Sequence, residues 1–209
     1  MNEHKTCAVP DCHDHRTRFG RFCHRHRRRL AYYGHPTVRP LSRTGEDLAG
    51  WSRKIAALMA ANADHPGLAR ASREIQQELD DAAQRARNGH TLSGVRAQWA
   101  RLAAHGVTPE MILARAVAVV VIERINPRLF PDQRSLEFAI ARAVFGLAPN
   151  TGTPGARVLA STGKRLIEQY VELIVATVAA LKASEDDARK RVADMQAPMR
   201  PAPITQTNP

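Results

Sequence analysis

Residues 108–127, TPEMILARAVAVVVIERINP, decide the fold class because they contain a run that is apolar on every side. Thr108 followed by Pro109 is typical of a helix start, where the Thr hydroxyl caps free amides and the ring presets the backbone angle. Four consecutive β-branched residues within 116–122 would also suit a strand, but the flanking Ala, Arg and Glu and the N-cap favour a helix. A helix without a polar face is buried on all sides, so the segment predicts the central helix of an all-α protein.

Segments on both sides of this helix show apolar residues at helical spacing, bounded by Gly, Pro or Asn. They predict helices over about 48–62, 68–88, 92–105 and 131–147, and a last long helix after a loop at 148–155. The spacing in the first three also suits an intermolecular coiled coil, although packing within the chain is the commoner outcome. The last helix carries the apolar positions Ile167, Tyr170, Val171, Ile174, Val178 and Leu181 before a charged run.

The positive charge of the 209-residue chain gathers near its N-terminus. The net charge is +11, and residues 1–43 hold ten Lys/Arg against three Asp/Glu, whereas residues 44–209 hold 21 against 17. A basic protein of this kind tends to bind polyanions. The most apolar runs, at 116–122 and 173–181, fall short of the roughly 20 residues that cross a bilayer, and no signal peptide is visible. We expect a cytoplasmic protein with no membrane contact.

The three cysteines all lie within this basic segment, with the spacing C-x4-C-x10-C-x2-H. An odd number of thiols in a reducing compartment argues against disulfides. Cys7, Cys12, Cys23 and His26 instead make a closed tetrahedral ligand set for Zn²⁺. Cys23 and His26 would share one face of a predicted helix over 22–33, which ends at Gly34. Rival fourth ligands are His13, His15 and His24, which are less favourably spaced.

Residues 7–36 resemble a small treble-clef-like zinc-finger module at the N-terminus of many phage and mobile-element proteins, including some HNH-type homing endonucleases. The positions that match the pattern are Cys7, Cys12, Cys23, His26, Arg29, Gly34 and Pro36. Arg27, Leu30 and His35 depart from it, where Tyr, Trp and Asp are usual. The resemblance implies a DNA-associated context and specifies no activity.

Neither of two catalytic motifs is complete. Asp14-His15 imitates the opening of an HNH site, but no Asn follows before Asn62. The run STGKR at 161–165 lacks the earlier Gly and the final Ser/Thr of a phosphate loop. We therefore expect a protein that is not an enzyme, with an unrecognised activity as the least favoured reading.

Arginines dominate one side of the predicted finger. On a helical wheel Cys23, His26, Leu30 and Tyr33 face the metal, and the other side is basic. Such a face suits phosphate contacts, from DNA more than from RNA, with the tyrosine able to stack. The alternatives are arginines that only solubilise the finger and a zinc-capped adaptor for protein partners. The predicted nucleic-acid-binding residues are Arg16, Arg18, Arg21, Arg25, Arg28, Arg29 and Tyr32.

The predicted organisation has four parts: a zinc finger at 1–36, a linker at 37–45, a helical domain at 46–196 and a disordered, Pro-rich tail at 197–209. The helical domain would pack, form a homodimer or recruit a protein partner.

Overall fold

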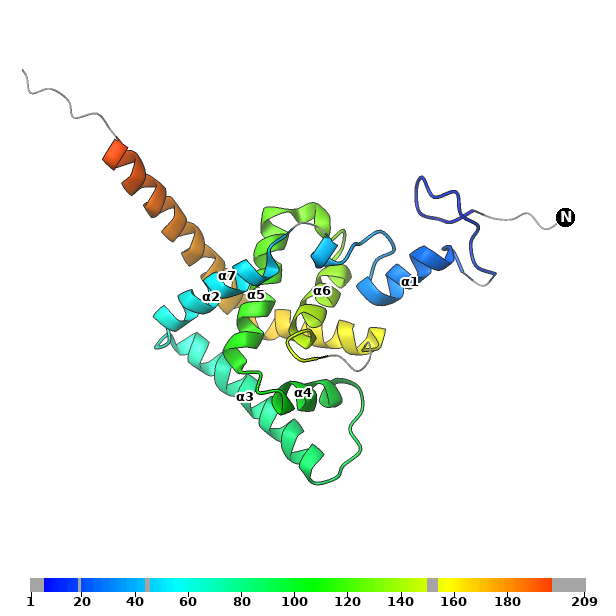
Figure 1. Ribbon diagram of the computed structural model, residues 1–209, viewed down its shortest axis with the longest axis horizontal. Coiled ribbons are helices and arrows are strands. Elements are labelled where there is room, and N and C mark those ends of the chain that lie inside the picture. The colour runs from blue at the N-terminus through cyan, green and yellow to red at the C-terminus, as the bar shows by residue number, and fades with distance from the viewer. Residues whose placement is uncertain (1–5, 19, 44–45, 150–153, 197–209) are drawn as a thin grey trace, which may run out of the picture.

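A computed structural model describes residues 6–18, 20–43, 46–149 and 154–196. Within these residues the chain is helical, and a single β-type pairing, between Thr6 and His15, is an isolated bridge. The predicted all-α class is confirmed, and the Cys/His segment precedes the helical body (Figure 1). The elements are α1 (His24–Tyr33), η1 (Leu41–Arg43), α2 (Leu48–Ala61), α3 (Pro66–Arg87), α4 (Gly94–Ala104), α5 (Pro109–Ile125), η2 (Pro127–Leu129), α6 (Gln133–Phe145) and α7 (Ala156–Gln196).

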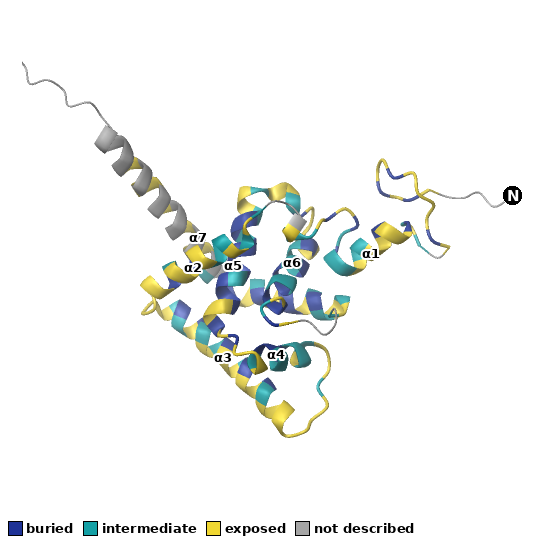
Figure 2. Ribbon diagram, in the orientation of Figure 1, coloured by how far each residue is buried: buried dark blue, intermediate teal, exposed yellow. Residues whose placement is uncertain are grey.

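Helix α5 is the centre of the body, as its sequence predicts. The Thr108 hydroxyl accepts a hydrogen bond from the amide of Met111 at 3.4 Å and caps the first turn. Ten residues of the helix are buried, and they point to all sides, because α2, α3, α6 and α7 each pack against it. Figure 2 shows α5 as a largely buried column among helices with exposed outer faces. Each fully buried aliphatic side chain here stabilises the fold by about 1.5–3 kcal/mol.

Four helices begin at positions other than the predicted ones, and local capping explains two of the shifts. Helix α1 begins at His24, not at residue 22, because Cys23 has an extended backbone and serves as N-cap. Helix α6 begins at Gln133, after Pro131, because Asp132 accepts the Ser135 amide at 2.8 Å in a reciprocal capping box. Helix α3 begins two residues earlier than predicted, with Pro66 in its first turn. Helix α4 begins at Gly94, not at residue 92, after Ser93 with its extended backbone.

Helix α7 packs against the body with its first half and then leaves it. Leu159 and Leu166 are buried, whereas Val175 is 52% exposed. Figure 1 shows the second half extending away from the other helices. Tyr170 is buried and Ile167 packs on the core, as predicted. The side chains of the later apolar positions, Val171, Ile174, Val178 and Leu181, lie outside the described part of the chain, as does the predicted tail at 197–209.

No single helix among the described residues has both the length and the apolar composition to cross a membrane. Helices α4 and α5 meet the two criteria only as a pair, and the chain bends by 118° between them.

Helix α1 is seated on the body through α6. Gly34 ends α1 with a positive φ of 76° and donates its amide to the Leu30 carbonyl at 3.0 Å, as the sequence predicts. A Cβ at this position would lie 3.0 Å from the Arg134 carbonyl oxygen and 3.1 Å from the Phe138 ring. After this contact Val38 is buried and Leu41 packs against the core of the body. The predicted linker covers 37–45, and its described part, residues 37–43, thus follows the body surface. The domain boundaries remain predictions.

The crossing of α6 and α7 depends on a second glycine. A Cβ built on Gly163 would overlap the backbone carbonyl of Glu137 in α6. The two helix backbones are therefore closer here than any side chain at residue 163 would allow.

We predict that Gly163→Ala destabilises the body. In most helix interiors Gly→Ala stabilises by about 0.5–1 kcal/mol, but here the added methyl must push α7 from α6, at a cost of about 1–3 kcal/mol. For a chain of this length each kcal/mol lowers the melting temperature by about 2–4 °C. Thermal unfolding followed by circular dichroism measures the shift. Gly155→Ala is the matched control, since a Cβ there meets nothing within 4 Å; equal melting temperatures for the two variants would contradict the prediction.

Candidate metal centre and nucleic-acid interface

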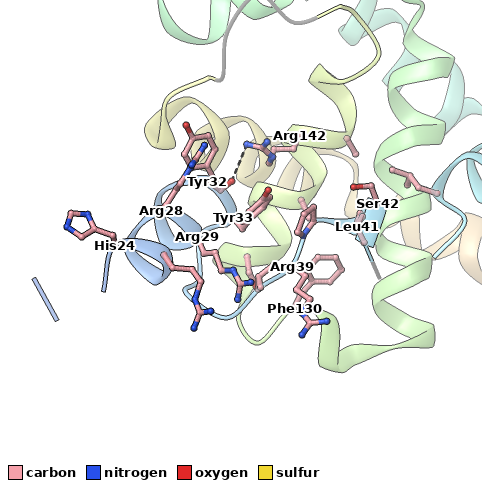
Figure 3. Close-up of a pocket in the computed structure, with 17 residues that line it drawn as sticks. His24, Arg28, Arg29, Tyr32, Tyr33, Arg39, Leu41, Ser42, Phe130 and Arg142 are labelled. Atoms are coloured by element: carbon pink, nitrogen blue, oxygen red, sulfur yellow. Dashed lines mark hydrogen bonds between the residues drawn. The ribbon is translucent and has the colours of Figure 1, made fainter. Parts of the chain in front are cut away.

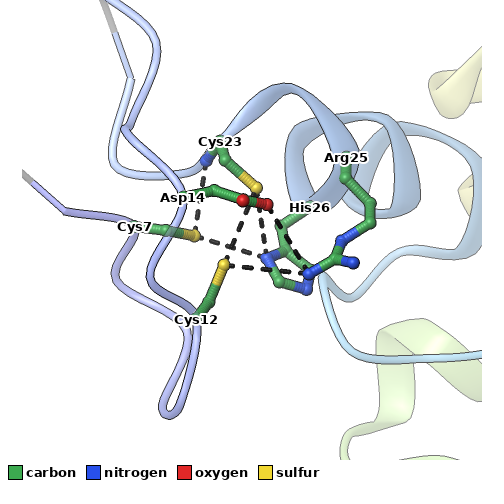
Figure 4. Close-up of polar contacts among 6 residues, drawn as sticks. All are labelled: Cys7, Cys12, Asp14, Cys23, Arg25 and His26. Carbon is green, nitrogen blue, oxygen red and sulfur yellow. Dashed lines mark hydrogen bonds and ion pairs between the residues drawn. The ribbon is translucent and has the colours of Figure 1, made fainter.

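The three cysteines and His26 converge in one buried cluster, as the spacing predicts (Figure 4). Their exposed fractions are 7% for Cys7, 8% for Cys12, 3% for Cys23 and 5% for His26. The ligand atoms all lie within 4.8 Å of one another. His26 Nδ1 is 3.3 Å from the Cys7 sulfur and 3.4 Å from the Cys23 sulfur, and the sulfurs of Cys12 and Cys23 are 4.0 Å apart.

These distances fit a tetrahedral ion. With Zn–S bonds of about 2.3 Å and Zn–N bonds of about 2.0–2.1 Å, a regular tetrahedron has S···S edges of about 3.8 Å and S···N edges of about 3.5 Å. The cluster is thus close to the size of a zinc coordination shell. Nδ1 is the imidazole nitrogen that faces the sulfurs, which makes it the donor atom of His26. The four residues form a group suitable for a metal ion.

Backbone hydrogen bonds fold residues 6–22 into the loop that supplies two of the thiols. The Cys7 amide donates to the Asp14 carbonyl at 3.0 Å, and the Ala8 amide donates to the Arg21 carbonyl at 2.9 Å. Apolar support is slight: Val9 and Phe22 alone among described hydrophobic residues pack with the cysteines. A segment with so small a core gains folding free energy from a structural metal.

The surroundings favour a thiolate at Cys7. Burial raises the pKa of this thiol, but the Cys23 amide, which donates to the sulfur at 3.3 Å, and other hydrogen bonds outweigh burial and lower the pKa to about 6. Burial raises the pKa of Cys23. Arg25 supplies a positive charge nearby: its guanidinium lies 3.9 Å from the Cys12 sulfur and 3.6 Å from the Asp14 carboxylate, and both contacts raise its pKa.

The rival histidines stay outside the cluster. His13, His15 and His24 are exposed, and none of them joins the group of ligand atoms found among the described residues. His24 and His26 both lie in α1, where positions two residues apart point about 200° apart, so His24 faces away from the site that His26 enters.

The predicted nucleic-acid-binding residues fall into three places. Arg16, Arg18 and Arg21 are exposed on the loop, and Arg25 lies against the Cys/His cluster, where it also borders the groove described next. Arg28, Arg29 and Tyr32 line a groove between α1 and the body. Tyr33, which the helical wheel placed on the metal side, also lines this groove, because α6 draws the C-terminal turn of α1 toward the body: the Arg142 guanidinium lies 5.1 Å from the Tyr33 ring centroid.

This groove, which we call the junction groove, has a volume of about 960 Å³ and two walls (Figure 3). One wall is α1, with Arg25, Arg28, Arg29, Tyr32 and Tyr33; the other is formed by residues 38–42 and 48, Phe130 and the α6 residues that include Arg142. Sequence reasoning missed Arg39 and Arg142. Arg39 looked like part of a linker and Arg142 like one polar position of an amphipathic helix, so no local signal could have placed either beside the finger.

Arg142 holds the two walls together. Its guanidinium donates to the Tyr32 carbonyl at 3.3 Å and lies 5.7 Å from the Tyr32 ring centroid. Arg28 approaches the same ring at 5.5 Å. Two guanidiniums of the groove, those of Arg28 and Arg142, thus lie over its tyrosine rings.

The chain matches no protein-family model, and no curated protein or solved structure shows a significant similarity to it. The resemblance of residues 7–36 to phage and mobile-element fingers therefore rests on the residues quoted for it alone.

We predict that the purified protein carries about one zinc ion per chain and that His26→Ala loses it, because three protein ligands leave a structural site open. His24→Ala is the matched control, an exposed histidine in the first turns of the same helix. Elemental analysis after gel filtration measures the metal. Equal zinc in both variants would show that the imidazole is not the fourth ligand.

Proposed function

We propose that this protein binds nucleic acid, DNA in the first place, through a zinc-stabilised finger, and that it serves as an accessory or regulatory protein of phage or mobile-element type. The observation that carries the proposal is the buried Cys7, Cys12, Cys23 and His26 cluster inside a strongly basic segment. The resemblance of residues 7–36 supports the DNA-associated context. The proposed role is binding and not catalysis, in the cytoplasm, and the helical body would mediate pairing or partner contacts.

Zinc would act by fixing the backbone that carries the arginines. Cys7 and Cys12 belong to the loop, and Cys23 and His26 begin α1, so one ion would tie the loop to the helix. Arg16, Arg18 and Arg21 lie between these two pairs of ligands along the chain. Arginine side chains held in a fixed array contact phosphates with less loss of conformational entropy than side chains on a disordered segment.

Charge supports phosphate as the ligand. Of the loop's arginines, each is exposed, and the acidic side chains described in the finger are those of Asp11 and Asp14. Asp14 is engaged by Arg25 at 3.6 Å. A protein that neutralises phosphates releases condensed counterions, so its affinity falls steeply with salt concentration.

We predict that the full-length protein binds labelled duplex DNA with an affinity that falls by a factor of at least about 10 between 50 and 200 mM salt. Removal of zinc with a chelator should abolish binding, since the arginine array loses its support. Fluorescence anisotropy titrations over a salt series, with and without chelator, measure both effects.

Matched triple variants localise the contact. Arg16→Ala/Arg18→Ala/Arg21→Ala should weaken binding and flatten the salt dependence by about one unit of slope per lost phosphate contact. Arg53→Ala/Arg73→Ala/Arg87→Ala removes the same charge from exposed positions of α2 and α3 and should matter far less. Binding that ignores both the chelator and the loop substitutions would refute the finger as the nucleic-acid-binding element and favour a zinc-capped adaptor.

A further inference from the structure

We propose that the junction groove binds a single-stranded segment of nucleic acid, and that Arg39 and Arg142 of the body complete a site that the finger begins. The inference rests on the proposed function and narrows its ligand: unpaired nucleotides inside the groove, held by both walls, in place of a duplex held by the finger alone.

The first argument is uncompensated charge. Five arginines from three separate segments line the groove, and among the described residues no Asp or Glu lines it. Arg28, Arg29, Arg39 and Arg142 have no carboxylate partner within the part of the chain that the structure describes. The fifth arginine, Arg25, is paired with Asp14 at 3.6 Å, so four of the five positive charges are uncompensated. A concave surface with charge of one sign concentrates the field and attracts a polyanion.

The second argument is shape. A duplex is usually read by an element that protrudes into one of its grooves, such as a helix in a major groove about 12 Å wide. Here the guanidiniums do not protrude but line a hollow between α1 and the body. A hollow of about 960 Å³ takes a few nucleotides of one strand, and a basic groove that follows the backbone is the usual site for single strands.

The third argument is the aromatic content. Tyr32 and Tyr33 are half-buried groove residues, with ring centroids 6.4 Å apart and an angle of 44° between the rings. The Arg142 guanidinium lies beside both rings. Unstacked bases bind aromatic rings and guanidinium planes, whereas bases inside a duplex already stack on each other. Figure 3 shows the tyrosines and Arg142 together at one end of the groove, with Arg29 and Arg39 toward the other.

The groove exists because α1 is held at both ends. Cys23 and His26 place its first turn in the Cys/His cluster, and Gly34 seats its last turn against Arg134 and Phe138 of α6. A strand in the groove would contact finger and body at once, so both contribute to its affinity.

The test compares a mixed-sequence oligonucleotide of about 15 nucleotides, labelled at one end, as a single strand and as its annealed duplex, with the full-length zinc-loaded protein. We expect the single strand to bind at least about tenfold more tightly than the duplex. An RNA strand of the same sequence forms a second arm, and either strand chemistry supports the proposal.

Substitutions of groove residues test whether the single strand binds in the groove. Arg39→Ala and Arg29→Ala should each weaken single-strand binding at least about fivefold and lower the salt slope by about 0.7, the value for one phosphate contact of a single strand. Arg73→Ala, at an exposed position of α3, is the matched control. Arg142→Lys keeps the charge but loses the planar stacking group, so it should weaken single-strand binding while the melting temperature stays within a few degrees of the wild type.

The outcomes separate this inference from the proposed function. Duplex binding equal to or tighter than single-strand binding, or an Arg39→Ala variant indistinguishable from Arg73→Ala, overturns the single-strand site while the finger remains a duplex binder through its loop. Absence of binding to every oligonucleotide at low salt overturns the proposed function and this inference together.

Discussion

The middle of α5 has no polar face that could lie against water, and the arrangement of the other helices depends on this constraint. Helix α5 must be surrounded, and α2, α3, α6 and α7 surround it. Once α6 is fixed against α5, its other side becomes available to receive α1, and α7 can cross it at Gly163. Because α5 fixes α6 and α6 holds α1, the position of the N-terminal segment depends indirectly on the burial of α5.

The N-terminal Cys/His segment is constrained in the opposite way, because it is too short and too polar to bury a hydrophobic core of its own. Its described apolar support is Val9, Phe22 and the thiols themselves. A metal can replace a hydrophobic core in such a segment, and the two stabilising strategies meet at α1. One end of that helix belongs to the candidate metal site and the other to the packed body.

Local chemistry in the sequence predicted the helices and the convergence of the three cysteines with His26, and it failed where distant segments meet. The C-x4-C-x10-C-x2-H spacing and the Gly34 stop were visible because ligand geometry and helix termination depend on neighbours in the chain. The start of α6 was missed because Pro131 and Asp132 both favour a helix start, and the sequence pattern does not decide between them. In the structure Asp132 is the N-cap, so the helix begins at Gln133. Arg39 and Arg142 were missed because their place in the groove depends on tertiary packing. Arg142 and Tyr32, for example, are in contact although they lie 110 residues apart in the sequence.

The fit of Gly34 against α6 limits how freely the finger can be exchanged. Short metal-stabilised segments are natural candidates for transfer between proteins, because they bring their own stability with them. Here the residue that ends α1 lies so close to Arg134 and Phe138 that a Cβ would already crowd them. A segment transplanted to another body would lose the contact that orients it, and a body given another such segment would need a glycine at the same junction. Exchange of the N-terminal segment is therefore expected to require that the glycine and the α6 surface it meets be exchanged together.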